Sequence, residues 1–121
     1  SMSTIKVDSI QATDETASRG VSGVAAAWVN FNGTGTVAVR ESENVASLTD
    51  TANGVYIVNF SNSMSNADYA ALLGSASVVY DQGTLQDTST ASYVGIKVQD
   101  GAVSSFIDAT IVSANVSGEL A

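Results

Sequence analysis

The sequence predicts an all-β fold: an antiparallel β-sandwich of roughly seven to nine short strands, preceded by an extended N-terminal segment. Runs rich in valine, isoleucine, tyrosine and phenylalanine recur about every ten residues, as in sandwiches. Asparagine-glycine and aspartate-glycine pairs, which favour tight hairpin turns, lie close to several of these runs. No segment shows the apolar period of an amphipathic helix of about three turns, so strands alternating with helices are not expected.

The strand candidates are short runs of β-branched and aromatic residues. Two further runs, 44–48 and 69–73, are weaker. The second follows Ser65-Asn66-Ala67-Asp68, which suits a helix cap, so a single helical turn is the alternative there. The neighbouring runs favour a strand. The stronger candidates are residues 24–31, 36–40, 55–60, 78–81, 93–98 and 106–112.

Three dipeptides predict tight turns between these strands. They are Asn32-Gly33, Asn53-Gly54 and Asp100-Gly101. Asparagine, aspartate and glycine tolerate the backbone angles that hairpin turns require, and proline is absent from the chain.

The domain organisation is expected to be simple. Residues 1–22 are interpreted as a tag remnant, with Ser1 left by cleavage, followed by an extended segment that leads into the fold. In that segment only Ile5, Val7 and Ile10 alternate weakly with polar residues. Residues 23–121 are predicted to form one β-sandwich domain, of a size that a single core can support.

The two faces of each predicted strand differ in polarity. In 93–98 the residues Val94, Ile96 and Val98 share one face, while the opposite face is wet. Runs 24–31 and 55–60 instead carry apolar residues on both faces. Either loops cover the outer faces of these central strands, or the outer faces meet another subunit. Three large side chains are therefore assigned to the core or to an oligomer interface: Trp28, Tyr56 and Phe60.

Composition argues against several classes of function. The chain has no histidine and no cysteine, which removes the commonest general base, thiol nucleophiles and the usual transition-metal ligands. The net charge of -8 disfavours nucleic acid and anionic membranes as partners. No run approaches the roughly 18 apolar residues of a membrane span. We expect neither an enzyme nor a cofactor.

Carboxylates offer no convincing metal or catalytic site. Asp50 and Asp100 lie beside predicted turns, where aspartate is expected to bond its own backbone. The segment 50–54 is the nearest approach to a calcium loop, but it has too few oxygen ligands and is better explained as a turn. We predict no metal site, although a site assembled from separate loops is left open.

Sugar binding commonly uses an exposed aromatic ring with amide and carboxylate groups nearby. Tyr80 and Tyr93 are the preferred rings, because tyrosine presents an apolar face and a wet hydroxyl. Gln82, with Gln86 and Asp87, is expected in a polar loop that follows Tyr80. The candidate ligand-binding residues are therefore Tyr80, Gln82 and Tyr93.

Residues 27–40, AWVNFNGTGTVAVR, resemble a block found in tail-fibre proteins of bacteriophages and prophages. Residues 41–50, ESENVASLTD, and 54–60, GVYIVNF, look like its continuation, as does Asp68-Tyr69-Ala70. The resemblance covers residues 24–73 and fades beyond them.

The resemblance implies a virion protein in a homotrimeric fibre that recognises a glycan or protein on the host cell surface. No catalytic or receptor-contacting residues come with it. The alternative is a purely structural spacer or trimerisation module of a fibre or baseplate.

Overall fold

The structure, a computed structural model, describes residues 2–11, 13–14, 16–17, 19–20, 24–77, 82–101 and 105–121. These residues form strands and turns and contain no helix, which confirms the predicted all-β class. Accordingly, the described part of the chain has no helix that could cross a membrane.

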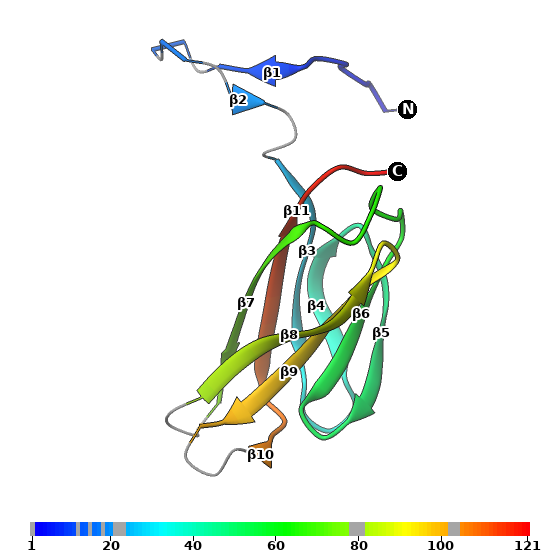
Figure 1. The fold of residues 1–121 in the computed structure, drawn as a ribbon, viewed down its shortest axis with the longest axis vertical. Helices are drawn as coiled ribbons and strands as arrows, with labels where there is room; N and C mark the ends of the chain where they lie inside the picture. The colour runs from blue at the N-terminus through cyan, green and yellow to red at the C-terminus, as the bar shows by residue number, and fades with distance from the viewer. Residues whose placement is uncertain are drawn as a thin grey trace.

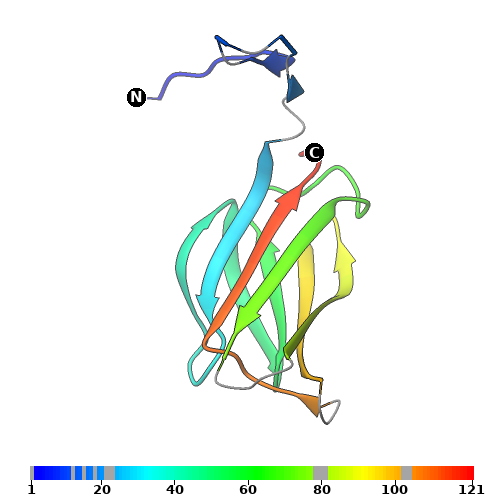
Figure 2. The same ribbon diagram turned by 90° about the vertical axis from the view of Figure 1, so that its left-hand side faces the viewer.

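Two antiparallel sheets pack face to face (Figure 1). The first, called here the β3 sheet, has the order β4-β3-β11-β7 and faces the viewer in Figure 2. In the second, the β9 sheet, the order is β10-β9-β6-β5, and β8 also pairs with β9. Their strands are β3 (Ala25–Asn32), β4 (Ala38–Glu43), β5 (Val45–Ala52), β6 (Val55–Phe60), β7 (Ala70–Ala76), β8 (Gln82–Thr90), β9 (Tyr93–Asp100), β10 (Ser105–Phe106) and β11 (Ile111–Ser117).

The core lies between the sheets and follows the predicted alternation. On β3 the side chains of Ala27, Val29 and Phe31 are buried, and β6 and β9 contribute their alternate residues in the same way. Phe31 and Tyr56, from opposite sheets, meet edge to face with ring centroids 5.2 Å apart. The inner faces inferred for these three strands are confirmed.

One predicted turn is confirmed and one is wrong. Asn53-Gly54 joins β5 to β6 directly, with Gly54 at φ 68°. Asn32-Gly33 instead opens a longer loop before β4, in which Gly35 takes the positive φ. Glycine is required at position 33 because the backbone there approaches the Tyr56 side chain closely: an added Cβ would lie 2.5 Å from the Tyr56 hydroxyl. The predicted Asp100-Gly101 turn leads into residues 102–104, outside the described residues.

The predicted strand 106–112 is wrong because the chain changes sheets there. β10 pairs with β9, whereas β11 pairs with β3 and β7. Residues 107–110 cross between the sheets, where the Ala109 carbonyl accepts the N–H of Gly33 and the Ala109 N–H donates to the Tyr56 hydroxyl. No single straight strand can pair in both sheets.

The two weaker strand predictions are confirmed, whereas the loop predicted for one polar segment is wrong. Runs 44–48 and 69–73 lie largely in β5 and β7, so the helical alternative is not observed. Gln82, Gln86 and Asp87, expected in a loop, instead belong to strand β8, where pairing with β9 overrides a composition without apolar alternation. The predicted strand 78–81 lies outside the described residues.

The leading segment is separate from the sandwich. It holds two strands of two residues each, β1 (Ser9–Ile10) and β2 (Arg19–Gly20), which pair with each other and stand beyond one end of the sandwich in Figures 1 and 2. Ile5 is 83% exposed, so this segment contributes little to the core.

A buried tyrosine ties three loops together at the opposite end. The Tyr56 hydroxyl lies 2.8 Å from the carbonyl oxygen of Gly33 and 3.1 Å from Asp108 Oδ1, and the same carboxylate oxygen accepts the backbone N–H of Gly54 at 2.8 Å. Burial raises the pKa of Tyr56 well above the ordinary value of 10.0. Burial also raises the pKa of Tyr69, which packs edge to face on Phe60.

The raised pKa values of Tyr56 and Tyr69 predict that the folded protein loses stability at alkaline pH. In the unfolded chain they ionise near pH 10, while the folded protein keeps them protonated to higher pH, so the unfolded state is favoured as the pH rises above about 10. The urea midpoint should be flat from about pH 8 to 9 and fall steeply from about pH 10 upward. Tyr56→Phe should make that fall shallower; an unchanged slope would contradict the assignment.

Candidate functional site

The outer face of the β3 sheet carries the chain's only tryptophan. Trp28 lies opposite Glu43 on β4 and opposite Asn115 on β11, and Asn115 in turn lies opposite Leu72 on β7. Residues paired in this way point to the same side of a sheet. A row of four side chains, Glu43-Trp28-Asn115-Leu72, therefore crosses the outer face.

A second row of shorter side chains runs beside the first. Here Asn30 is opposite Glu41 and Ser113, and Ser113 is opposite Gly74. Gly74 has no side chain, and the Oγ of Ser113 lies 3.3 Å from the place that a Cβ would take. The second row is consequently lower than the first.

The difference in height leaves a shallow groove of about 440 Å³ on this face. Its lining comes from β3, β7 and β11, and the two large apolar side chains are Trp28 and Leu72. Leu72 is 78% exposed and Trp28 is half-buried. We call this feature the Trp28 groove.

The charged groups beside the groove are mostly acidic. Glu41 and Glu43 belong to the two rows and are exposed. Arg40, displaced into a bulge of β4, donates to the Thr110 carbonyl oxygen at 2.6 Å and to Asn30 Oδ1 at 3.3 Å. The guanidinium is thus fixed at the edge of the sheet. The charged groups beside the groove are therefore two carboxylates, Glu41 and Glu43, and one cation, Arg40.

The structure separates the three residues assigned to the core or to an interface. Tyr56 and Phe60 are 0% and 8% exposed and belong to the core. Trp28 is not part of that buried cluster, because its position on β3 alternates with the inward-facing Ala27 and Val29. A core role for Trp28 is wrong, whereas a role at an interface stays a prediction.

The two proposed sugar-binding residues that the structure describes, Tyr93 and Gln82, lie far apart. Tyr93 lies opposite Asn59 and Thr90 at one end of β9, and Gln82 lies opposite Asp100 at the other. Seven residues of extended strand separate these ends by about 23 Å. The Nε2 of Gln82 is buried and has no partner among the described residues. Tyr80 lies outside the described residues.

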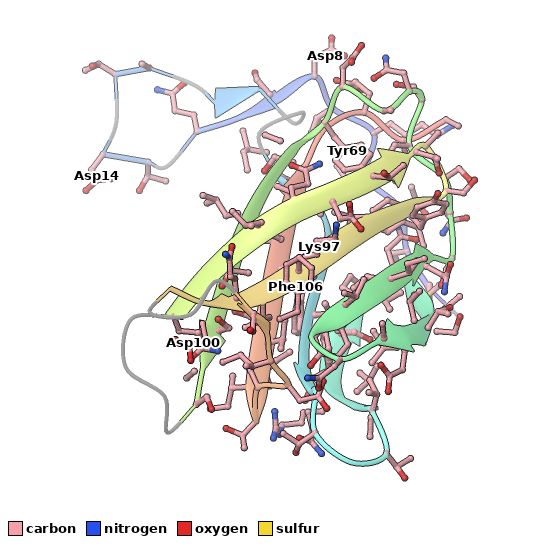
Figure 3. All side chains as sticks on the ribbon, turned by 60° about the horizontal axis from the view of Figure 1, so that its bottom comes forward. Asp8, Asp14, Tyr69, Lys97, Asp100 and Phe106 are labelled. Atoms are coloured by element: carbon pink, nitrogen blue, oxygen red, sulfur yellow. The ribbon has the colours of Figure 1, made fainter. Side chains whose placement is uncertain are left out.

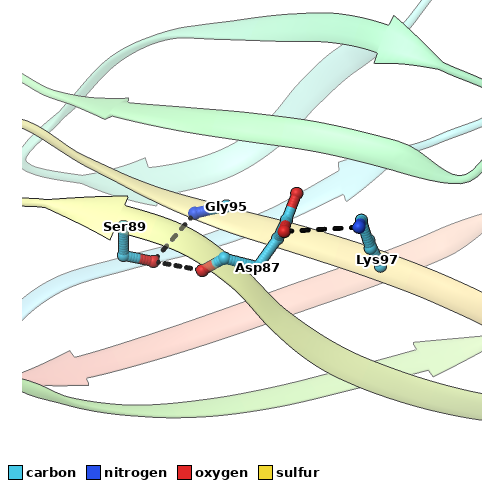
Figure 4. Close-up of polar contacts among 4 residues, drawn as sticks. All are labelled: Asp87, Ser89, Gly95 and Lys97. Atoms are coloured by element: carbon cyan, nitrogen blue, oxygen red, sulfur yellow. Dashed lines mark hydrogen bonds and ion pairs between the residues drawn. The ribbon is translucent and has the colours of Figure 1, made fainter.

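The outer face of the β9 sheet holds a small polar cluster that serves the strand pairing. Lys97 Nζ lies 3.4 Å from Asp87 Oδ1 and 5.1 Å from the centre of the Phe106 ring (Figures 3 and 4). Ser89 Oγ donates to the Asp87 carbonyl and accepts from the Gly95 N–H (Figure 4). These contacts bridge an irregularity in the β8–β9 register. Because they satisfy one another, they indicate local stabilisation.

The described residues contain no group of three acidic side chains that could hold a metal ion. Asp108, the most enclosed carboxylate of the Tyr56 network, is committed to Gly54 and Tyr56. Asp50 is exposed on β5. The Trp28 groove, which combines an aromatic ring with amide and hydroxyl groups, is therefore taken as the candidate binding site.

Sequence reasoning missed the Trp28 groove, although the signal was present. The alternation in run 24–31 predicts its second apolar face. Asn115 and Leu72 lie far from that run in sequence, and only the pairing of strands places them on the same face. Comparisons of this chain with protein-family models, with curated proteins and with solved structures gave no match.

Proposed function

We propose that this chain is a non-enzymatic adhesion domain of the phage tail-fibre type, which binds a glycan or protein of the host cell surface through the Trp28 groove. The observation that carries the proposal is the position of Trp28. It stands on the outer face of a sheet whose inner face already fills the core. The sequence resemblance of residues 24–73 to tail fibres supports the same function and a virion location.

The physical argument concerns a part-buried tryptophan on the outer face of the sandwich. Large aromatic side chains bury 150–250 Å² and dominate the energetics of interfaces. Trp28 is part-buried and Leu72, on the far side of Asn115, is highly exposed, so part of the indole and most of the leucine side chain remain open to solvent. A partner that covers the groove would gain that burial. A homotrimeric fibre multiplies weak single sites by avidity.

One observation favours the alternative, a structural or trimerisation module. Leu72 and Trp28 lie on either side of Asn115 on one outer face, and apolar side chains on such a face are also found where subunits meet. In that case the groove is filled by a neighbouring copy, and no ligand is bound there.

Two aromatic variants on opposite sheets test the proposal. Trp28→Ala should reduce binding of the biotinylated protein, presented on streptavidin, to a printed panel of bacterial surface polysaccharides by at least about tenfold. Tyr93→Ala, which removes a part-buried ring from the β9 sheet, is the matched control and should bind as the parent does. Both variants should unfold in urea close to the parent.

Three results would change the conclusion. Loss of binding with Tyr93→Ala alone would move the site to the β9 sheet. Binding to no polysaccharide and to no protein of a bacterial surface extract would overturn adhesion. A trimer by light scattering that dissociates in Trp28→Ala, without any binding, would establish the trimerisation module.

A further inference from the structure

The chemistry of the Trp28 groove selects among the ligands that an adhesion domain could take. We propose that the groove binds an uncharged saccharide, with one sugar ring stacked on the indole of Trp28, and that Glu41 and Glu43 exclude acidic saccharides. This inference rests on the proposed adhesion function and deepens it.

The dimensions of the groove suit a sugar ring. Trp28 and Leu72 are two strands apart across β11, a separation of about 10 Å between the backbones of β3 and β7. The low row beside them, with Gly74 and Ser113, leaves the indole accessible along the groove. A pyranose can therefore place its C–H face on the ring and still remain above the sheet.

The polar groups of the groove match hydroxyl groups. Asn30, Asn115 and Ser113 bring amide and hydroxyl groups that both donate and accept hydrogen bonds. Glu41 and Glu43 can only accept when ionised, and sugar hydroxyls are suitable donors to them. An apolar surface surrounded by such mixed groups fits a saccharide better than it fits a purely apolar ligand.

The charge of the groove argues against acidic ligands. Glu41 and Glu43 are paired with Asn30 and Trp28 of the groove, and Arg40, bonded to Thr110 and Asn30, offsets only one of these two negative charges. The whole chain carries a net charge of -8, which adds a repulsive field. Sialylated, phosphorylated or uronic-acid saccharides would place like charges against these carboxylates. A second copy of the chain would also have to bury them, and it carries the same net charge.

Because Trp28 is the only tryptophan, its fluorescence reports this site alone. The probes are maltoheptaose, cellohexaose, a galactan oligosaccharide and chitohexaose as uncharged chains, with oligogalacturonate and oligosialate as acidic ones. At least one uncharged probe should shift the emission of Trp28 to shorter wavelength in a saturable titration, and that response should not change with salt. The acidic probes should give no response at physiological ionic strength.

Three variants test the shape of the groove, its charge and a control change of charge. Gly74→Val fills the low row without touching Trp28, and it should weaken the uncharged probe by at least about tenfold while the urea midpoint is retained. Glu41→Gln with Glu43→Gln should raise binding of the acidic probes by about tenfold. Asp14→Asn with Asp50→Asn, an equal change of charge on exposed positions away from the groove, should leave both classes unchanged.

The failures of the two proposals are distinguishable. If the protein binds surface polysaccharides but Trp28 responds only to acidic probes, or to none, the uncharged-saccharide inference is wrong and adhesion stands. If Gly74→Val binds as the parent does, the groove is not the site. If emission of Trp28 instead shifts with protein concentration alone, the groove is a contact between copies and the inference is overturned.

Discussion

Replacing Gly54 with alanine is expected to destabilise the protein by about 3 to 4 kcal/mol. Gly54 has φ 68°, a left-handed conformation that costs other residues about 1 to 2 kcal/mol. An added Cβ would also lie 2.5 Å from the carbonyl oxygen of Ile107 and 2.8 Å from that of Val98, both of them backbone atoms that cannot rotate away. Urea unfolding followed by circular dichroism measures the change.

Gly35→Ala is the matched control for this prediction. Gly35 has a similar φ of 58°, but nothing lies within 4 Å of the place that a Cβ would take. The variant should lose only about 1 to 2 kcal/mol, the cost of the backbone conformation. Equal losses of stability in Gly54→Ala and Gly35→Ala would show that the segment near Ile107 moves aside at little cost, which would contradict its close packing against Gly54.

Phe31→Ala should be the other severe variant, with a loss of about 3 to 5 kcal/mol. Phe31 is 0% exposed and its ring packs on Tyr56 of the opposite sheet, so truncation leaves a cavity between the two sheets. Unfolding in urea, with the midpoint and slope compared with those of the parent, gives the magnitude.

Phe106→Ala provides the comparison on the surface. The Phe106 ring is 39% exposed, and Lys97 Nζ lies over it at 5.1 Å from its centre. Its removal should cost less than about 1 kcal/mol. A loss at Phe106 as large as at Phe31 would mean that the outer cluster of the β9 sheet, and not the buried layer, dominates the stability of the sandwich.

Local patterns were sufficient to predict the layers of this fold. Alternation in 24–31, 55–60 and 93–98 identified the buried faces, because a period of two is a property of the strand itself. The pattern could not show where the chain crosses between sheets at residues 107–110. That crossing is fixed by backbone hydrogen bonds outside the strand ladders, from Gly33 to Ala109 and from Ile107 to Val98.

The candidate site was predicted only in part, for the same reason. The apolar outer face around Trp28 is visible in the sequence, but its neighbours Asn115 and Leu72 are placed by pairing across three strands. Strand β8 was missed because serine, threonine and glutamine give no apolar alternation. Tyr93, chosen as an exposed ring, lies on the sheet opposite to Trp28, where it has no aromatic neighbour among its strand partners.

The order of strands in the β3 sheet also bears on how the chain reaches its fold. β3 pairs with β11, so the pairing at the centre of this sheet cannot form until residues 111–117 are available. Contacts so distant along the chain require closure of a long loop, and folding of such all-β topologies is typically slow, from milliseconds to seconds. During synthesis the apolar strand Ala25–Asn32 emerges long before β11, its partner at the centre of the sheet. Until residues 111–117 have been made, β3 can pair along one edge only, with β4, and its other edge remains open to aggregation.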